Sequence, residues 1–361
     1  MRTLDRSYWK GRRVFLTGHT GFKGAWLGYW LTTMGAEVHG YALAPATDPS
    51  MFELLQLDQL LTHQIGDVRN STDLSEALES CDPEVVFHLA AQPIVSEGYA
   101  APVETFDTNV MGVVHLLEAC RLLDKPVPVL IVSSDKCYLN KGTGRAFEID
   151  DPLGGYDPYS ASKAGTEIVT TSYRASFFGN PDAPRIASGR AGNVVGGGDW
   201  SLDRLLPDCA RAFHRGEPVI LRNPLATRPW QHVLEPLYGY LVLAQALAED
   251  SSFARPWNFG PVDRNHQPVG QVAELFQAAW GDGTQIEVSK YKQDWKEAAT
   301  LDLNCTETTQ SLHFTPVLDI DDTITLTADW YRKAYADRSA EMVRRVTEEQ
   351  IRYYETLQER H

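Results

Sequence analysis

A tyrosine and a lysine four residues apart, Tyr159 and Lys163, are the pair of side chains in this chain best suited to proton transfer. On a helix, residues at this spacing lie on one face. There the ammonium can lower the pKa of the phenol from its usual value of about 10 and make it a proton acceptor. Tyrosine and lysine also meet at this spacing by chance, as a surface pair. The pattern therefore indicates chemistry only together with other motifs.

A glycine pattern near the N-terminus is the second motif. A short apolar run at 13–17, suited to a buried strand, is followed by Gly18-x-x-Gly21-x-x-Gly24 and a helical stretch at 25–34. We expect Gly18 to permit a tight turn, Gly21 to let backbone approach a pyrophosphate, and Gly24 to allow close packing of helix and strand. The alternative is a glycine-rich turn without a ligand. Its place between strand and helix favours dinucleotide binding.

Composition and charge exclude some classes of function. The net charge of −15 argues against nucleic-acid binding, which normally leaves a basic footprint, although a small anion could still bind. The five cysteines have no metal-ligand spacing and are odd in number, so we expect neither a metal site nor a disulfide framework. No signal peptide is visible, and the apolar runs are too short to cross a bilayer. We expect a cytoplasmic protein without a membrane partner.

Apolar runs alternate with helical stretches through the first half of the chain, which predicts an α/β fold with a doubly wound, Rossmann-like parallel sheet and right-handed crossovers. A helix is expected over 109–123. Ligands of such folds bind at the carboxyl ends of the strands. The expected strands are 13–17, 38–43, 64–68, 84–90 and 127–134.

After residue 185 the pattern loosens, which predicts two domains. Residues 1–185 are expected to bind the cofactor, with segments at roughly 225–260 returning to that domain. Residues 186–361 should form mainly a smaller, interleaved substrate domain and a helical tail. The tail, from residue 321 onward, reads most simply as a solvated amphipathic helix with Glu355 among its polar positions, and partner binding is the alternative.

Three motifs occur in the order Gly18-x-x-Gly21-x-x-Gly24, His88-Leu89-Ala90-Ala91-Gln92 and Tyr159-x-x-x-Lys163. In this order they resemble those of extended short-chain dehydrogenases that act on nucleotide sugars, and most of all the CDP-glucose 4,6-dehydratases. The resemblance covers about residues 8–265 and fades from about 280. Supporting strings are T-G-H-T-G-F-K-G (17–24), S-D-K-C-Y (134–138), G-G-Y-D-P-Y-S-A-S-K (154–163), R-A-G-N-V-V-G-G-G-D-W (190–200), D-R-L-L-P-D (203–208) and T-R-P-W-Q-H-V-L-E-P (227–236).

The resemblance implies a reaction in which NAD takes a hydride from sugar C4, water leaves across C5 and C6, and the hydride returns to C6. Tyr159 matches the base for the C4 hydroxyl, Lys163 the residue that holds the cofactor ribose, and Ser134 a hydrogen-bond donor to the C4 oxygen. Asp135 matches the acid that protonates the departing C6 hydroxyl, and Lys136 the base at C5. A lysine acts as a base only if its pKa is depressed. The alternative is an Asp-Lys pair that neutralises itself in a loop.

Further positions carry over from the family. The glycine loop adds Thr20, Phe22 and Lys23 to the cofactor contacts, Asp67 and Val68 match the adenine contacts, and Ala90, Ala91 and Gln92 match a strand end beside the cofactor. Asn193 and Arg228 match ligands of the substrate pyrophosphate, and Leu206 and Pro207 fall where the nucleotide base packs. For Arg222 and His232, a site role and an ordinary structural role are equally good interpretations. Relatives pair two helices per subunit, here 109–123 and the helix with Tyr159, so we expect a homodimer or homotetramer.

The sequence departs from the family in three places. The second strand ends without the acidic residue expected at the adenosine ribose, and Ser96 stands where the family carries arginine. The segment 139–146 replaces a stretch rich in tryptophan. Another nucleotide-sugar dehydratase, a 4-epimerase and a non-catalytic nucleotide-binding regulator therefore remain alternatives. The epimerase would not need Asp135 and Lys136, and the regulator would not need Tyr159 with Lys163.

Overall fold

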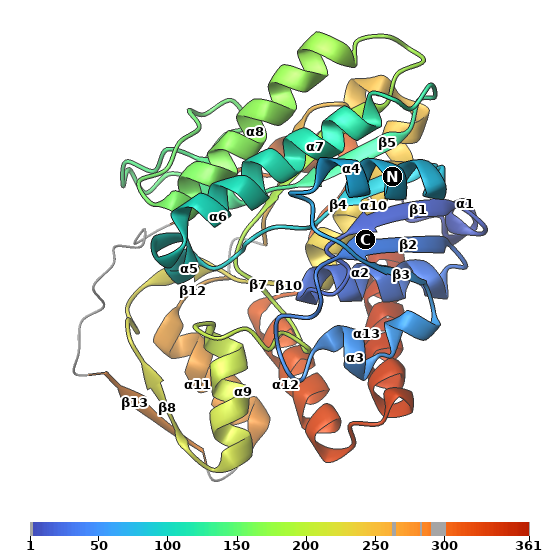
Figure 1. The fold of residues 1–361 in the computed structure, drawn as a ribbon. Coiled ribbons are helices and arrows are strands. Elements are labelled where there is room, and N and C mark those ends of the chain that lie inside the picture. Colours follow the sequence, from blue (N-terminus) through green and yellow to red (C-terminus); the bar gives the residue numbers. More distant parts are fainter. Residues whose placement is uncertain (1–2, 262–264, 282–283, 290–300, 361) are drawn as a thin grey trace.

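The computed structural model describes residues 3–261, 265–281, 284–289 and 301–360. Its centre is a seven-stranded parallel sheet with the order β11-β6-β5-β4-β1-β2-β3 (Figure 1). The strands are β1 (Arg13–Thr17), β2 (Glu37–Ala42), β3 (Thr62–Ile65), β4 (Val85–His88), β5 (Pro128–Val132), β6 (Arg185–Ala191) and β11 (Pro256–Phe259). The predicted doubly wound, Rossmann-like fold is confirmed. The strand order reverses beside β1, which is where folds of this type bind ligands.

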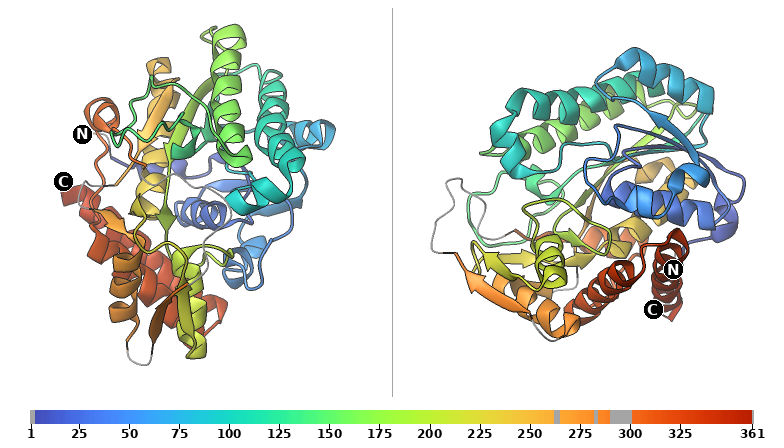
Figure 2. Two further views of the ribbon diagram at one scale, coloured as in Figure 1. Left: turned by 90° about the vertical axis from the view of Figure 1, so that its left-hand side faces the viewer. Right: turned by 60° about the horizontal axis from the view of Figure 1, so that its bottom comes forward.

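Helices cover both faces of the sheet. On one face lie α4 (Ser71–Cys81), α7 (Gly112–Cys120) and α8 (Pro158–Phe177), and on the other α2 (Phe22–Thr33) and α10 (Leu234–Glu249) (Figures 1 and 2). Because successive strand residues point to opposite faces, Phe15 packs with α4 and α7 while Val14 and Leu16 pack with α2 and α10. Short helices are α1 (Arg6–Trp9), α3 (Met51–Leu54), α5 (Val95–Ala100) and α6 (Pro102–Phe106).

The bounds of several expected strands shift by one or two residues, and two expected elements differ more clearly. Strand β3 covers Thr62–Ile65 rather than 64–68, and Gly66 follows it against the Tyr41 ring, where a Cβ would come within 2.2 Å of the ring. The helix expected over 109–123 is a π-helical turn, Asp107–Met111, followed by α7, which ends at Cys120. In that turn the Asn109 side chain hydrogen-bonds the backbone of Gln92. The π-helical turn thus anchors the chain that follows β4.

A smaller lobe lies beside the carboxyl ends of the strands. It contains α9 (Leu205–Arg215), α11 (Val269–Trp280) and the parallel pair β8 (Pro218–Leu221) and β13 (Gln285–Val288) (Figure 1). Two more pairs are β7 (Val194–Val195) with β10 (Gln231–His232), and β9 (Thr227–Pro229) with β12 (His266–Pro268). The expected division of the chain into two domains stays a prediction.

The tail consists of α12 (Ile320–Ala336) and α13 (Ala340–Arg360), which lie below the sheet in Figure 1. It is amphipathic, but Glu355 does not lie on a solvated face: it accepts hydrogen bonds from Arg6 at 2.7 Å and from the Trp30 indole at 2.8 Å. Tyr354, also on α13, donates to Glu235 of α10, and burial raises the pKa of that carboxyl to about 7. The tail is therefore part of the core. Within the described ranges, no helix combines the length and the apolar character that crossing a membrane requires.

Candidate functional site

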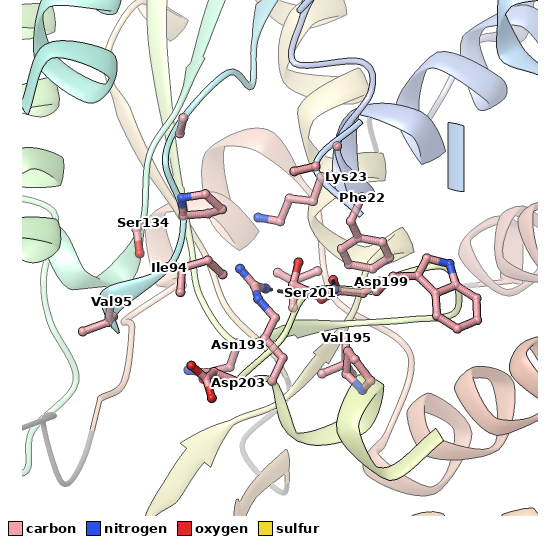
Figure 3. Close-up of a pocket in the computed structure, with 18 of the residues that line it drawn as sticks. Phe22, Lys23, Ile94, Val95, Ser134, Asn193, Val195, Asp199, Ser201 and Asp203 are labelled. Atoms are coloured by element: carbon pink, nitrogen blue, oxygen red, sulfur yellow. Dashed lines mark hydrogen bonds and ion pairs between the residues drawn. The ribbon is translucent and has the colours of Figure 1, made fainter. Parts of the chain in front are cut away.

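A pocket of about 1100 Å³ opens at the carboxyl ends of the central strands. One side of it, here called the glycine-loop side, consists of the loop 18–24 and the chain directly after β2, β3 and β4. The opposite side, here called the α9 side, consists of the chain from 193 to the first turn of α9 and the chain from β8 to Arg228. In Figure 3, Lys23 extends into the pocket toward the side where Ser134 lies, and Asn193 and Asp203 project from the α9 side.

The glycine loop fits tightly against its neighbours. Gly18 has a φ of +77°, and a Cβ there would come within 2.6 Å of the Ala90 nitrogen. At Gly24 a Cβ would lie 2.0 Å from the Gly18 oxygen, whereas at Gly21 it would lie 3.4 Å from that oxygen, an ordinary contact. The Thr20 hydroxyl donates to a carbonyl oxygen at the end of β2 at 2.8 Å. Side chains are therefore excluded at Gly18 and Gly24 by backbone contacts, and the N-terminus of α2 faces the pocket.

Tyr159 and Lys163 lie one turn apart at the start of α8, and both are buried and line the pocket. Asp157 caps this helix by accepting a hydrogen bond from the Ser160 nitrogen at 2.9 Å. Burial lowers the pKa of Lys163 to about 8, although the Glu167 carboxylate opposes the shift. Because the Lys163 ammonium loses hydration, its charged form is destabilised, and a polar ligand that accepts its hydrogen bonds would stabilise it.

The expected lowering of the Tyr159 pKa is not found. Burial raises the pKa of this phenol, because the phenolate loses its hydration. The main opposing charge is Lys136 rather than Lys163; the Lys136 ammonium lies 6.0 Å from the centre of the Tyr159 ring. A hydrogen bond with Ser134 also stabilises the phenolate. The lysine expected to act at C5 is thus also the cation that most favours the ionised tyrosine.

Ser134, Asp135 and Lys136 form a turn directly after β5. The Ser134 hydroxyl accepts a hydrogen bond from the backbone nitrogen of Lys136 at 3.2 Å and donates one to Asp135 Oδ1 at 2.9 Å. Asp135 Oδ2 is buried and has no hydrogen-bond partner among the described residues. Gly192 makes room for it, because a Cβ at this glycine would lie 1.8 Å from Oδ2. This buried carboxyl oxygen therefore lies against Gly192 without a hydrogen bond from the described residues.

A buried ion pair lies next to this turn and contacts Tyr138, which lies two residues after it. Arg190 of β6 contacts Glu167 of α8 at 2.9 Å and donates to the Tyr138 hydroxyl at 2.6 Å. Tyr138 in turn donates to Asn258 of β11 at 2.7 Å. Because Glu167 lies one turn after Lys163, the pair connects the helix of Tyr159 to the turn of Asp135. Removing one partner would leave an unpaired buried charge, which is strongly destabilising.

The α9 side contains strained and unpartnered polar residues. Asn193 has a φ of +47°, and no described residue hydrogen-bonds its Nδ2. Asp203 has a φ of +61°, and it accepts hydrogen bonds from Ser96 at 3.2 Å and from Arg222 at 2.7 Å. Left-handed backbone at residues other than glycine is costly and concentrates at ligand sites. Arg228 lines the pocket and is buried.

Comparison with known proteins identifies the family. A family model described as GDP-mannose 4,6 dehydratase matches residues 15–325. A CDP-glucose 4,6-dehydratase of Salmonella typhimurium is 44% identical over 334 residues, which are 91% of this chain and 93% of that protein. The chain belongs to the GDP-mannose 4,6-dehydratase family. The resemblance found in the sequence is thereby confirmed.

Solved structures of the same fold include members with two kinds of activity. An epimerase of Methanothermobacter thermautotrophicus superposes with a TM-score of 0.78 at 18% identity, covering 94% of this chain and 96% of that one. A dTDP-glucose 4,6-dehydratase of Bacillus anthracis, in complex with NAD, gives a TM-score of 0.73 at 18% identity, covering 91% and 99%. At this identity the likeness shows the fold of the family and not its substrate.

All but one of the residues that the sequence predicts for the site line the pocket. Gln92 is the exception: its side chain donates to Thr105 at 2.9 Å and accepts from the Ile94 nitrogen at 2.5 Å. Its cofactor contact stays a prediction. The residues brought together are Gly18, Thr20, Gly21, Phe22, Lys23, Gly24, Asp67, Val68, Ala90, Ala91, Ser134, Asp135, Lys136, Tyr159, Lys163, Asn193, Leu206, Pro207 and Arg228.

The structure also locates the residues whose role the sequence left open and the positions at which the sequence departs from the family. Arg222 lines the pocket, whereas His232 is a core residue that packs edge-on against Trp26. Ser96, in place of the family's arginine, hydrogen-bonds Asp203 across the pocket. The segment 139–146 contributes no residue to the part of the pocket that the structure describes; its Arg145 pairs with Asp151 instead.

Sequence reasoning missed several polar residues of the site. Arg204 is one of the charges that lower the pKa of Lys23 to about 7, after burial itself. Asp203 and Asp208 line the α9 side with it. The string 203–208 was the available signal, because it places three charged residues around the start of a helix whose next residues are apolar.

Proposed function

We propose that this chain is a hydro-lyase that catalyses NAD-dependent 4,6-dehydration of CDP-glucose to CDP-4-dehydro-6-deoxyglucose. The observation that carries the proposal is the meeting of Tyr159 with Asp135 and Lys136 in one pocket. Oxidation at C4 needs one base, whereas loss of water needs a second acid and base. The relative that is 44% identical acts, by its name, on CDP-glucose.

The glycine-loop side fits a dinucleotide. Close backbone contacts at Gly18 and Gly24 keep side chains out of the loop, and the N-terminus of α2 offers backbone donors to a pyrophosphate. Asp67 and Val68 are assigned to the adenine, and this is supported by their place on the pocket surface directly after β3; the Asp67 carboxylate pairs with Arg69 at 2.6 Å. NAD held on this side would supply the hydride acceptor for C4 and the hydride donor for C6.

Oxidation begins with removal of the C4 hydroxyl proton by Tyr159. Its phenolate is disfavoured by burial and favoured by the Lys136 ammonium and the Ser134 hydroxyl. In this mechanism the Ser134 hydroxyl turns its proton from Asp135 to the C4 oxygen of the substrate, and Lys163 holds the cofactor ribose. These roles are supported by the placement of all four side chains on the pocket surface.

Elimination follows because the C4 ketone acidifies the proton at C5. For this step a proton passes from the Lys136 ammonium to the Asp135 carboxylate. Lys136 then accepts the C5 proton while Asp135 protonates the departing C6 hydroxyl, and Lys136 returns a proton to C5 when the hydride is added to C6. Support for the role of Asp135 comes from its buried, unpartnered Oδ2. Asn193 and Arg228 bind the substrate pyrophosphate, and Leu206 and Pro207 pack against the base; all four line the α9 side.

Incubation with CDP-glucose tests the proposal directly. The expected product is a 4-keto sugar with its characteristic absorbance in alkali, formed without stoichiometric consumption of NAD. A 4-epimerase would instead release a C4 epimer and would have no use for Asp135 and Lys136. A non-catalytic nucleotide-binding regulator would bind CDP-glucose unchanged.

We also propose that the enzyme is a homodimer or homotetramer in the cytoplasm. The helices α7 and α8 lie side by side on one face, as Figures 1 and 2 show. Large apolar side chains are exposed on or next to these helices: Val103, Phe106, Met111 and Ile168. A second copy that covers them would form a four-helix bundle. Sedimentation as a monomer at micromolar concentration would contradict the oligomer.

A further inference from the structure

One acidic side chain of the α9 side has no role in the reaction described above. Asp208 lies in the first turn of α9, next to Leu206 and Pro207, and all three line the pocket. The opposite wall of this end is β8, which packs against α9 and contributes Val219 and Leu221. The buried side chains of Leu206, Val219 and Leu221 make this end of the pocket apolar.

The Asp208 carboxylate is held in place on one side only. Arg211, one turn later on α9, donates to its Oδ1. Arg211 is itself fixed by hydrogen bonds to the carbonyl oxygens of Trp200 at 2.8 Å and Ser201 at 3.0 Å. In the described part of the chain, no hydrogen bond reaches Asp208 Oδ2. One acceptor oxygen of a fixed carboxylate is therefore free at the apolar end of the pocket.

The Asp208 carboxylate is only partly solvated, since 34% of its side chain is exposed. Burial raises the pKa of Asp208, opposed by Arg211 and Arg222, while Asp203 reinforces the increase. An ionised carboxylate in such a place gains more from an added donor than one in water. An acceptor oxygen brought to the same point would be repelled.

We propose that Asp208 selects cytosine as the base of the substrate by accepting a hydrogen bond from its exocyclic amino group. Uracil and thymine carry an oxygen at that ring position, where cytosine carries the amino group, and a carboxylate cannot donate to it. Asp208 thus attracts cytosine and repels the other pyrimidines, which is how specific sites reject close analogues. This inference rests on the proposed function, in which Leu206 and Pro207 pack against the base.

Equilibrium binding of CDP and UDP, measured by calorimetry on the full-length protein, tests the inference without turnover. The wild type should bind CDP about 10- to 100-fold more tightly than UDP, the range for one hydrogen bond to a charged group. Asp208→Asn should lower that ratio at least about tenfold, because its amide can turn either an acceptor or a donor toward the base.

Asp203→Asn is the matched control. It removes one negative charge from the same side of the pocket, but that carboxylate is already bound by Ser96 and Arg222. The ratio of CDP to UDP affinity should stay within about twofold of the wild type, since no base contact is changed. An equal loss of preference in both variants would overturn the inference, because it would assign discrimination to general charge.

Melting temperatures show whether each variant is folded, and Asp208→Ser provides a second truncation if Asp208→Asn is not. Unfolding of both would overturn the inference by making Asp208 structural. A folded Asp208→Asn protein that keeps the wild-type preference for CDP would also overturn it, and would leave the proposed function intact. A wild type that prefers UDP or GDP, and that fails to convert CDP-glucose, would instead refute the proposed function.

Discussion

The glycine-loop side and the α9 side of the pocket are built on opposite principles. On the glycine-loop side, backbone contacts exclude a Cβ at Gly18, and the Thr20 hydroxyl is already bound within the protein. On the α9 side, Asn193 and Asp203 have left-handed backbone, and Asn193 Nδ2 and one oxygen of Asp208 have no partner among the described residues. The glycine-loop side is shaped mainly by close backbone contacts, although His19 Nδ1 is buried there without a partner among the described residues, whereas the α9 side combines left-handed backbone with unmet hydrogen bonds.

This difference fits a cofactor that is regenerated in every cycle and a substrate that must leave. In the proposed function the glycine-loop side holds the dinucleotide by its backbone shape, so substitutions there should act through steric clashes. On the α9 side, left-handed residues other than glycine each cost of order 1–3 kcal/mol, and contacts with a ligand can offset that cost. Substrate binding should therefore stabilise the α9 side more than the glycine-loop side.

Where the two sides meet, Tyr159→Phe should have the largest effect. Removing the phenol should lower kcat by about 10²- to 10⁴-fold, the usual contribution of a positioned acid or base. The Kd for CDP should change little, because the phenol is assigned to proton transfer and not to holding the nucleotide. Stopped-flow rates and calorimetry on one preparation measure both quantities. A variant that retains most of its rate would show that the base is another group.

Lys136→Met should slow turnover by about 10²-fold and also change the pH dependence of the oxidation step. Lys136 is the main charge that lowers the pKa of Tyr159, so its loss should raise that pKa. Because the base must be deprotonated, the rise of the oxidation rate should move to higher pH. The rate at which absorbance of reduced nicotinamide appears after mixing measures this step.

Asp135→Asn is the matched control for that shift. The Asp135 charge raises the pKa of Tyr159, so neutralising it should move the oxidation profile to lower pH. Loss of water should slow in the same variant. Shifts of the same sign in the two variants would contradict the electrostatic account of Tyr159.

Gly18→Ala and Gly21→Ala separate shape from contact on the glycine-loop side. An alanine at 18 needs left-handed backbone and would come within 2.6 Å of the Ala90 nitrogen, so the melting temperature should fall by several degrees. An alanine at 21 meets only an ordinary contact at 3.4 Å, so stability should hold while NAD affinity falls. Thermal melts with and without NAD make the comparison. Equal destabilisation would mean that the loop is not shaped as described.

Asn193→Gly should produce a small change in stability, opposite in sign to that of Gly18→Ala. Glycine adopts a positive φ without strain, so the apo protein should gain about 0.5–1 kcal/mol, a rise of a few degrees at most. Affinity for CDP should fall, since the amide assigned to the pyrophosphate is lost. A destabilised variant with unchanged affinity would contradict the idea that the α9 side stores strain for its ligand.

The sequence predicted what depends on local spacing. Gly18, Gly21 and Gly24 fall within one strand–turn–helix unit, and Tyr159 with Lys163 within one helical turn, so periodicity alone places them. The turn after β5 was predicted through the family resemblance, but the contacts that its side chains make were not predicted.

What the sequence could not predict depends on segments that meet only in the fold. Lys136 and Tyr159 are far apart in the sequence, so spacing could not indicate that the ammonium lies 6.0 Å from the centre of the ring. Likewise, Gly192 makes room for Asp135, which lies 57 positions earlier in the chain. Asp208 is held by Arg211, which is itself bound to the loop before α9, and Oδ2 has no hydrogen bond from the described residues. Strand β3 was misplaced because its residues are mostly exposed and lack the apolar pattern of the inner strands.

Tracing the hydrogen at C4 tests the central claim most directly. With CDP-glucose deuterated at C4, the account predicts a 4-keto-6-deoxy product that carries the label at C6, since the hydride that leaves C4 returns two carbons away within the same turnover. Nuclear magnetic resonance and mass spectrometry of the product locate the label. Deuterium retained at C4 of an epimerised sugar, or lost to a stoichiometric equivalent of reduced cofactor, would contradict the account.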